Sequence, residues 1–225
     1  MPHSKSICGV IGMAALNRTM QKALVCIATL CALPANAASP PRIVSQGTQQ
    51  TPGCASCHGA AGDGSLVGVP RLAGQIGGYM VKQLNDFKTG RRASNVMQPI
   101  AKYLSAGDVR TAAAWYAAQS HPVPANPTPN AAQHAQGETL ARVGDWSRNI
   151  PSCNSCHGPD GSGVAPSFPA LRGQRPDYVI AQLKAWKAGQ RKNDPMHLMG
   201  GVAAALTDAD VNAVALYYGS LGGKP

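Results

Sequence analysis

The sequence predicts an all-α protein built from two similar helical domains in tandem. The five-residue pattern Cys-X-X-Cys-His occurs at residues 54–58 and again, 99 residues later, at 153–157. The residues that follow each copy also match at this offset, which indicates duplication of one structural unit. Apolar residues in the matching segments recur at helical spacing, and Ser/Thr-X-X-Asp capping signals precede two of these segments.

The first 37 residues have the features of an export signal. A lysine precedes an apolar run at 23–33, and Ala-Asn-Ala at 35–37 fits the small-residue rule for signal cleavage. The apolar run is shorter than the roughly 20 residues that cross a bilayer, so we expect a soluble periplasmic protein and not an integral membrane protein. Both Met1 and Met20 are possible translation starts.

Removal of this signal would leave four of the seven cysteines, all in the repeated motif: Cys54, Cys57, Cys153 and Cys156. A disulfide framework is common in exported proteins, but it does not explain a histidine directly after each pair. A zinc ribbon has its cysteine pairs only about 15 to 20 residues apart. The motif is typical of covalent haem attachment, so we expect the thiols to form thioethers and His58 and His157 to bind iron.

The charge is positive and unevenly distributed. Loss of the signal would remove three basic residues from the full chain (+10), which leaves 17 − 10 = +7. Residues 38–129 carry 8 basic and 3 acidic groups (+5), and residues 130–225 carry 9 and 7 (+2). This balance favours redox protein partners with an acidic docking face. Because the basic residues are scattered, we do not expect nucleic-acid binding.

The sequence of the first half predicts little regular structure before the motif and two helices after it. Prolines allow little more than one helical turn at 38–53, and glycines predict a loop at 62–68. Apolar spacing predicts a helix over 79–89 that ends at Gly90. Ser105 and Asp108 predict the capped start of a helix that runs to about residue 119.

A proline-rich linker at 121–130 separates a predicted domain at 38–120 from a second at 131–225. The second half repeats the first, and after three additional residues the offset becomes 102. Thr207 and Asp210 then take the places of the first capping pair. One asymmetry precedes the second motif, where residues 131–144 can form a helix that the first half has no room for.

With both motifs, the repeated Pro, Gly-Gln, Tyr and Gln-Leu positions and a downstream methionine, residues 45–225 resemble the di-haem cytochromes c of the cytochrome c4 type. The resemblance implies a tandem pair of class I cytochrome c domains, each a small all-α fold wrapped around one covalently bound haem. It therefore implies two haem c groups per chain. It also implies that the carbonyls of Pro70 and Pro169 accept a hydrogen bond from the proximal histidines.

The same resemblance implies His/Met ligation, by His58 and Met97 on the first iron and by His157 and Met199 on the second. Met97 has no competitor in its repeat, because Met80 lies within a predicted helix and suits core packing. In the second repeat Met196 and His197 compete with Met199. Like Met97, Met199 lies seven residues before the leucine next to a capped helix, and this spacing favours it.

Two arginines and two histidines are also possible contacts of the haems. Arg92 and Arg191 repeat, and either bind a haem propionate or are solvated. His121 and His134 do not repeat, so we expect them on the surface.

Two classes of function follow from this interpretation. The resemblance implies an electron carrier, not an enzyme, that connects respiratory-chain donors to a terminal acceptor such as a membrane-bound oxidase or reductase. The alternative is an electron-accepting cytochrome subunit of a dehydrogenase, or a haem oxidoreductase of the thiosulfate-oxidising or peroxidase type. A catalytic haem needs an open distal position, whereas each repeat supplies candidates for both axial ligands.

Overall fold

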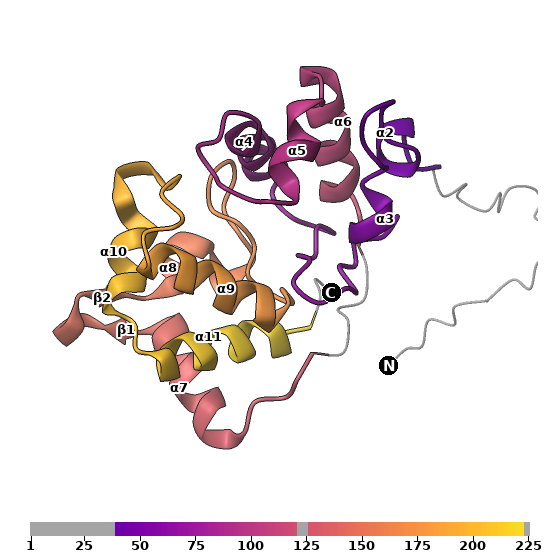
Figure 1. Ribbon diagram of the computed structural model, residues 1–225. Coiled ribbons are helices and arrows are strands. Elements are labelled where there is room, and N and C mark those ends of the chain that lie inside the picture. The colour runs from indigo at the N-terminus through magenta and orange to yellow at the C-terminus, as the bar shows by residue number, and fades with distance from the viewer. Residues whose placement is uncertain (1–38, 121–125, 223–225) are drawn as a thin grey trace, which may run out of the picture. The chain divides into compact units, whose positions relative to one another are not determined.

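The computed structural model describes residues 39–120 and 126–222, and in this part the chain is mainly helical (Figure 1). The predicted signal at 1–37 and residues 121–125, with His121, lie outside the described residues. None of the helices in the described part combines the length and apolar character needed to span a bilayer.

The first repeat contains the elements that the sequence predicts, together with short helices that it does not. They are α2 (Arg42–Ser45), α3 (Ala55–His58), α4 (Gly77–Lys88), α5 (Met97–Lys102) and α6 (Ala106–Ala117). Helix α2 is one turn long, as its flanking prolines predict. The capping box at the start of α6 is confirmed, since the Asp108 amide donates to Ser105 Oγ at 3.1 Å and the Ser105 amide donates to Asp108 Oδ2 at 2.9 Å.

The second repeat is longer before its motif. It begins with α7 (Ala131–Arg142), which confirms the predicted helix, and continues with β1 (Gly144–Asp145), the 3-10 turn η1 (Trp146–Arg148) and β2 (Ile150–Pro151). The two strands are antiparallel, with Gly144 opposite Pro151. The remaining elements are α8 (Cys153–His157), η2 (Pro159–Gly161), α9 (Pro176–Lys187), η3 (Pro195–His197), α10 (Leu198–Ala205) and α11 (Asp208–Ser220).

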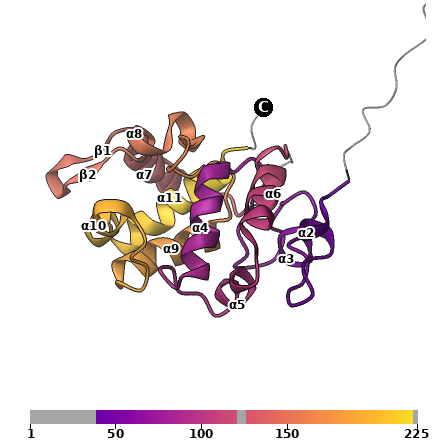
Figure 2. The same cartoon turned by 90° about the horizontal axis from the view of Figure 1, so that it is seen from above.

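Each repeat buries its own apolar core around its last helix. In the first, α6 contacts α4 and α2; in the second, α11 contacts α7 and α9 (Figure 2). Met80 lies in the first core, as its position in the predicted helix indicates. The hairpin of the second repeat contributes Ile150, whose side chain is fully buried among residues of α9, α10 and α11.

Two buried glutamines join the repeats in a nearly symmetric way. Gln75 Oε1 accepts from the Ala170 amide at 2.7 Å, and Gln75 Nε2 donates to the Ala170 carbonyl at 3.0 Å. Gln174 makes the same pair of bonds with the Arg71 backbone, at 2.8 and 3.0 Å. The glutamine of each repeated Gly-Gln dipeptide therefore binds the backbone of the other repeat. The residue that it binds directly follows Pro169 in one case and Pro70 in the other.

Candidate haem-binding sites

The first motif occupies α3 and its N-cap, Cys54, so the chain places its two thiols and its imidazole on one short segment. Cys54 Sγ lies 3.4 Å from the Ile43 carbonyl, so the single turn of α2 holds the first thiol. His58 is 8% exposed, and its Nδ1 lies 3.1 Å from the Pro70 carbonyl oxygen.

The second motif, on α8, has the same arrangement. Cys153 Sγ lies 3.4 Å from the Leu140 carbonyl of α7. His157 is 7% exposed, and its Nδ1 lies 2.8 Å from the Pro169 carbonyl oxygen. The contact expected between each motif histidine and the proline 12 residues later is confirmed in both repeats.

These contacts determine which nitrogen of each ring is available to a metal. A carbonyl oxygen can only accept, so Nδ1 carries the proton and Nε2 retains its lone pair. Burial also lowers the pKa of His58 and His157, which favours the neutral imidazole that ligates iron. Among the described residues, neither Nε2 takes part in a hydrogen bond, so both are free to act as ligands.

A tyrosine from the last helix of each repeat contacts the motif or the residue directly after it. Tyr116 donates to the Gly59 carbonyl at 3.1 Å, and Tyr218 donates to Asn154 Oδ1 at 2.7 Å. Gly62, with φ 80°, lies so close to the Tyr116 ring that an added Cβ would be 2.6 Å from a ring carbon. The sequence shows that these tyrosines repeat, but only the structure shows their contacts at the motifs.

The candidate sixth ligands differ in burial. Met97 is the first residue of α5 and is half-buried; its amide donates to Ser94 Oγ at 3.0 Å. Met199 is half-buried in α10 and packs against the core of the second repeat. Met196 is 84% exposed, and both Met196 and His197 have positive φ values. A ligand must turn inward, so this geometry favours Met199 over both competitors.

The alternatives of a disulfide framework and a zinc site find no support in the described residues. All four motif cysteines are free thiols. In the same ranges, no three His, Cys, Asp or Glu side chains converge as ligands for a metal ion. Thiols left unpaired, one exposed and three half-buried, next to a neutral imidazole fit covalent attachment and axial ligation of a haem.

A buried N–H group in the second repeat could donate a hydrogen bond to a carboxylate of a bound group. Trp186 Nε1 is buried without a hydrogen-bond partner among the described residues, although its ring stacks under the Arg191 guanidinium at 3.8 Å. A buried N–H without an acceptor is costly, and a haem propionate is an acceptor of suitable chemistry. The residues present therefore fit a haem in the second repeat.

The two repeated arginines are buried, so the solvated interpretation is wrong. Arg92 and Arg191 are each 6% exposed and lie between the repeats. Their hydrogen bonds reach the opposite repeat, which a sequence pattern cannot show. His134, by contrast, is exposed and lies 3.9 Å from Glu138, which confirms its predicted place on the surface.

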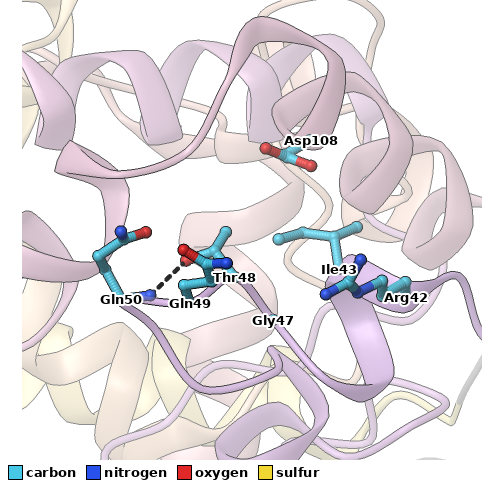
Figure 3. Close-up of a pocket in the computed structure, with 7 residues that line it drawn as sticks. All are labelled: Arg42, Ile43, Gly47, Thr48, Gln49, Gln50 and Asp108. Carbon is cyan, nitrogen blue, oxygen red and sulfur yellow. Dashed lines mark hydrogen bonds between the residues drawn. The ribbon is translucent and has the colours of Figure 1, made fainter.

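A cavity of about 370 Å³ lies beside the start of α6, and none of the eight predicted site residues lines it (Figure 3). It is lined by Arg42, Ile43, Gly47, Thr48, Gln49, Gln50 and Asp108. The second repeat has Gln136 and Arg148 against the matching carboxylate, Asp210, at 2.8 and 2.7 Å. The carboxylate that borders the cavity in the first repeat therefore has an equivalent in the second repeat that is contacted by α7 and η1.

Comparisons with known proteins agree with this two-domain architecture. The cytochrome c family model matches residues 45–120 and 135–222. The thiosulfate dehydrogenase electron acceptor of Stutzerimonas stutzeri (strain A1501) is 46% identical over 200 residues, which cover 88% of this chain and 93% of that protein. Cytochrome c4 of Thiocapsa roseopersicina is 42% identical over 171 residues, covering 73% of this chain and 84% of the relative.

Solved structures show the same likeness. The thiosulfate dehydrogenase TsdBA from Marichromatium purpuratum superposes with a TM-score of 0.74 and 38% identity over 80% of this chain. This chain spans 39% of that longer protein. Reduced cytochrome c4 from Pseudomonas stutzeri superposes with a TM-score of 0.69 and 34% identity, covering 75% of this chain and 93% of that structure.

Proposed function

Because this chain belongs to the cytochrome c family and has the two haem-binding domains of the cytochrome c4 type, we propose that it accepts electrons from a thiosulfate-oxidising dehydrogenase. Its role is electron transfer without a substrate reaction of its own. Of the two classes of function expected from the sequence, we therefore propose the electron acceptor of a dehydrogenase first. A carrier of electrons from general respiratory donors is the second candidate.

The observation that carries this proposal is the extent of the similarity to the acceptor from Stutzerimonas stutzeri. The alignment covers nearly the whole of both chains. A second acceptor of the same name, from Thiomonas intermedia (strain K12), is 44% identical over 85% of this chain. The likeness therefore extends over both repeats and the segment between them.

We assign the haem-binding roles to the residues that repeat. Cys54, Cys57, Cys153 and Cys156 form the thioethers. His58 and Met97 ligate the first iron, and His157 and Met199 the second. Each haem, when bound, supplies an iron that takes up and releases one electron. Methionine as the sixth ligand favours the ferrous state and so raises the potential.

The second candidate is a carrier that delivers electrons to a membrane-bound oxidase or reductase. The cytochrome c4 relatives favour it, because they are also similar along most of their length. The two candidates differ in the partner and not in the site. In both, the protein acts after export to the periplasm and docks on an acidic face of its partner.

Reduction by a purified dehydrogenase tests the first candidate. The oxidised di-haem protein is mixed with thiosulfate dehydrogenase and thiosulfate, and haem reduction is followed by stopped-flow absorption. We expect both haems to be reduced at the rate of enzyme turnover, and no reduction when either the enzyme or thiosulfate is omitted. Mitochondrial cytochrome c at the same concentration is the control carrier.

A reduction rate no higher than that of the control carrier would contradict the dehydrogenase role. The second candidate then predicts that oxidase-containing membranes reoxidise the reduced protein rapidly. Met97→His provides a matched variant, since imidazole lowers the potential of one haem and should leave one readily reduced haem instead of two.

A further inference from the structure

A hydrogen-bonded cluster at the boundary between the repeats contains both buried arginines. Arg92, from the first repeat, donates to Gln83 Oε1 at 2.7 Å within its own repeat. It also crosses the boundary and donates to Tyr178 Oη at 2.9 Å and to Gln182 Oε1 at 2.6 Å. Most of the hydrogen bonds of its side chain are therefore made with the second repeat.

Arg191 mirrors this pattern from the second repeat. It donates to Gln182 Oε1 at 2.9 Å in its own repeat, and across the boundary to Tyr79 Oη and Gln83 Oε1, both at 3.1 Å. Each glutamine oxygen thus accepts from both arginines. The two guanidinium groups consequently lie within a few ångströms of each other, held by acceptors that belong to both repeats.

The positive charge of this cluster is not neutralised by a bonded carboxylate. Among the described residues, the acceptors of the two arginines are amide and phenol oxygens. The nearby carboxylate, Asp86, is held by Lys82, Arg91 and Asn193. Burial would raise the pKa of Tyr79, but the positive charges of Arg191 and Arg92, together with Lys82, outweigh it and lower the pKa.

We propose that Arg92 and Arg191 act as one shared cationic pair that raises the reduction potentials of both haems together. The proposal rests on the two-haem function given above. A fixed buried charge acts strongly through a medium of low dielectric, and it disfavours the ferric state, which has one more positive charge than the ferrous state. Hydrogen bonds to both repeats hold the pair at their boundary, so its charge lies beside both domains and acts on the irons of both.

The pair also has the chemistry to bind haem carboxylates. Guanidinium groups bind carboxylates through paired, charge-assisted hydrogen bonds, and each arginine here stacks on an aromatic ring of its own repeat, Phe87 at 4.6 Å and Trp186 at 3.8 Å. A propionate bound by the pair would reduce the positive field that the two arginines produce at the irons. The remaining field would still depend on both arginines. The prediction of a common effect on the two irons is unchanged.

Redox titration of variants tests the shared effect in the isolated holoprotein. Arg92→Gln removes the charge but can still form hydrogen bonds, and we expect it to lower both one-electron potentials. Arg92→Lys keeps the charge and should leave both near the wild-type values. Arg110→Gln removes an exposed charge from the same repeat and is the matched control, with little effect on either. Met199→His, combined with each variant, identifies the step of the second haem.

Movement of the first haem's step alone in Arg92→Gln would overturn the proposal, as would equal shifts in the Gln and Lys variants. Tyr178→Phe removes a bond across the boundary without changing charge, so we expect both potentials to be retained. If it lowers them as much as Arg92→Gln does, packing and not charge is responsible, and the proposal is wrong. No partner enters these measurements, so a failed dehydrogenase assay leaves this test unaffected.

Discussion

At the scale of single residues, a backbone carbonyl prepares each motif histidine for ligation. The bond from Nδ1 to Pro70 or Pro169 selects the tautomer, fixes the ring and leaves Nε2 with its lone pair. Burial adds to this by favouring the neutral ring. The two imidazoles are therefore oriented before any iron is bound, which reduces the reorganisation that ligation requires.

The sixth ligand of the second haem provides a residue-scale prediction. Met199→Ala should open one position on the second iron, because the half-buried sulfur is removed and nothing of similar chemistry replaces it. We expect loss of the sulfur-to-iron absorption band of that ferric haem and binding of one carbon monoxide per reduced chain. Met196→Ala is the matched control, since that side chain is 84% exposed. The opposite pattern would assign ligation to Met196.

At the scale of elements, the repeats differ most in what precedes their motifs. In the second repeat α7 and the hairpin place Gln136 and Arg148 against Asp210. In the first, α2 is a single turn, and Asp108 is bonded only to Ser105 among the described residues. The equivalent capping carboxylates therefore differ in their surroundings. Asp210 forms an ion pair in the second domain, whereas Asp108 borders an open cavity in the first.

This difference predicts unequal costs for one substitution. Asp210→Asn keeps an acceptor for the cap but breaks the ion pair that the buried Asp210 carboxylate forms with the partly exposed Arg148. It should therefore lower the free energy of unfolding by more than the equivalent substitution in the first repeat does. Asp108→Asn removes no ion pair and should cost less than about 1 kcal/mol. Urea unfolding of the holoproteins measures both. Equal costs would mean that the ion pair contributes no net stability.

The ion pair also has a pH signature. Burial alone would raise the pKa of Asp210, but bonds from Arg148, Thr207 and Gln136 hold it well below its usual value of 3.8. A depressed folded-state pKa gives stability that is present above pH 4 and is lost as the pH falls toward the folded value. Wild-type stability should therefore fall more steeply below pH 4 than that of Asp210→Asn. Parallel acid curves would contradict this assignment.

At the scale of the whole molecule, the two domains share a pseudo-symmetric boundary but differ in charge. Gln75 and Gln174 exchange equivalent bonds, and the arginine cluster crosses the same boundary. The excess positive charge nevertheless lies in the first half (+5 against +2). The cross-bonded interior favours coupling between the haems, whereas the unequal charge favours docking of an acidic partner on the first domain.

The charge asymmetry predicts a salt-dependent rate of reduction by the partner. The rate should fall as ionic strength rises from about 0.01 to 0.15 M, where the screening length shrinks from roughly 30 to 8 Å. Arg110→Glu should reduce both the rate at low salt and its dependence on salt. Lys184→Glu, an equal change at an exposed site in the second domain, should have the smaller effect. A rate insensitive to salt would exclude electrostatic steering.

Much of this protein could be predicted from local sequence patterns. The haem motif is a spacing of five residues, the capping boxes join residues three apart, and the prolines around α2 limit it to one turn. The offset of 99 residues also reveals the duplication. The motif, the caps and the length of α2 depend on covalent spacing or on neighbours within a helical turn or two, and the duplication is visible as a repeated order of residues. The order of residues along the chain is therefore enough to predict them. The assignment of Met97 and Met199 as ligands remains a prediction of the same kind.

Other properties depend on contacts between residues about 100 positions apart. The sequence shows that Arg92, Arg191 and the Gly-Gln dipeptides repeat, but not that they are buried or bonded to the opposite domain. It also does not predict the hairpin, whose short strands are stabilised by the burial of Ile150 among distant helices. Burial and pairing of this kind are decided when separate segments pack, because a buried polar group must find its partner wherever the fold brings one.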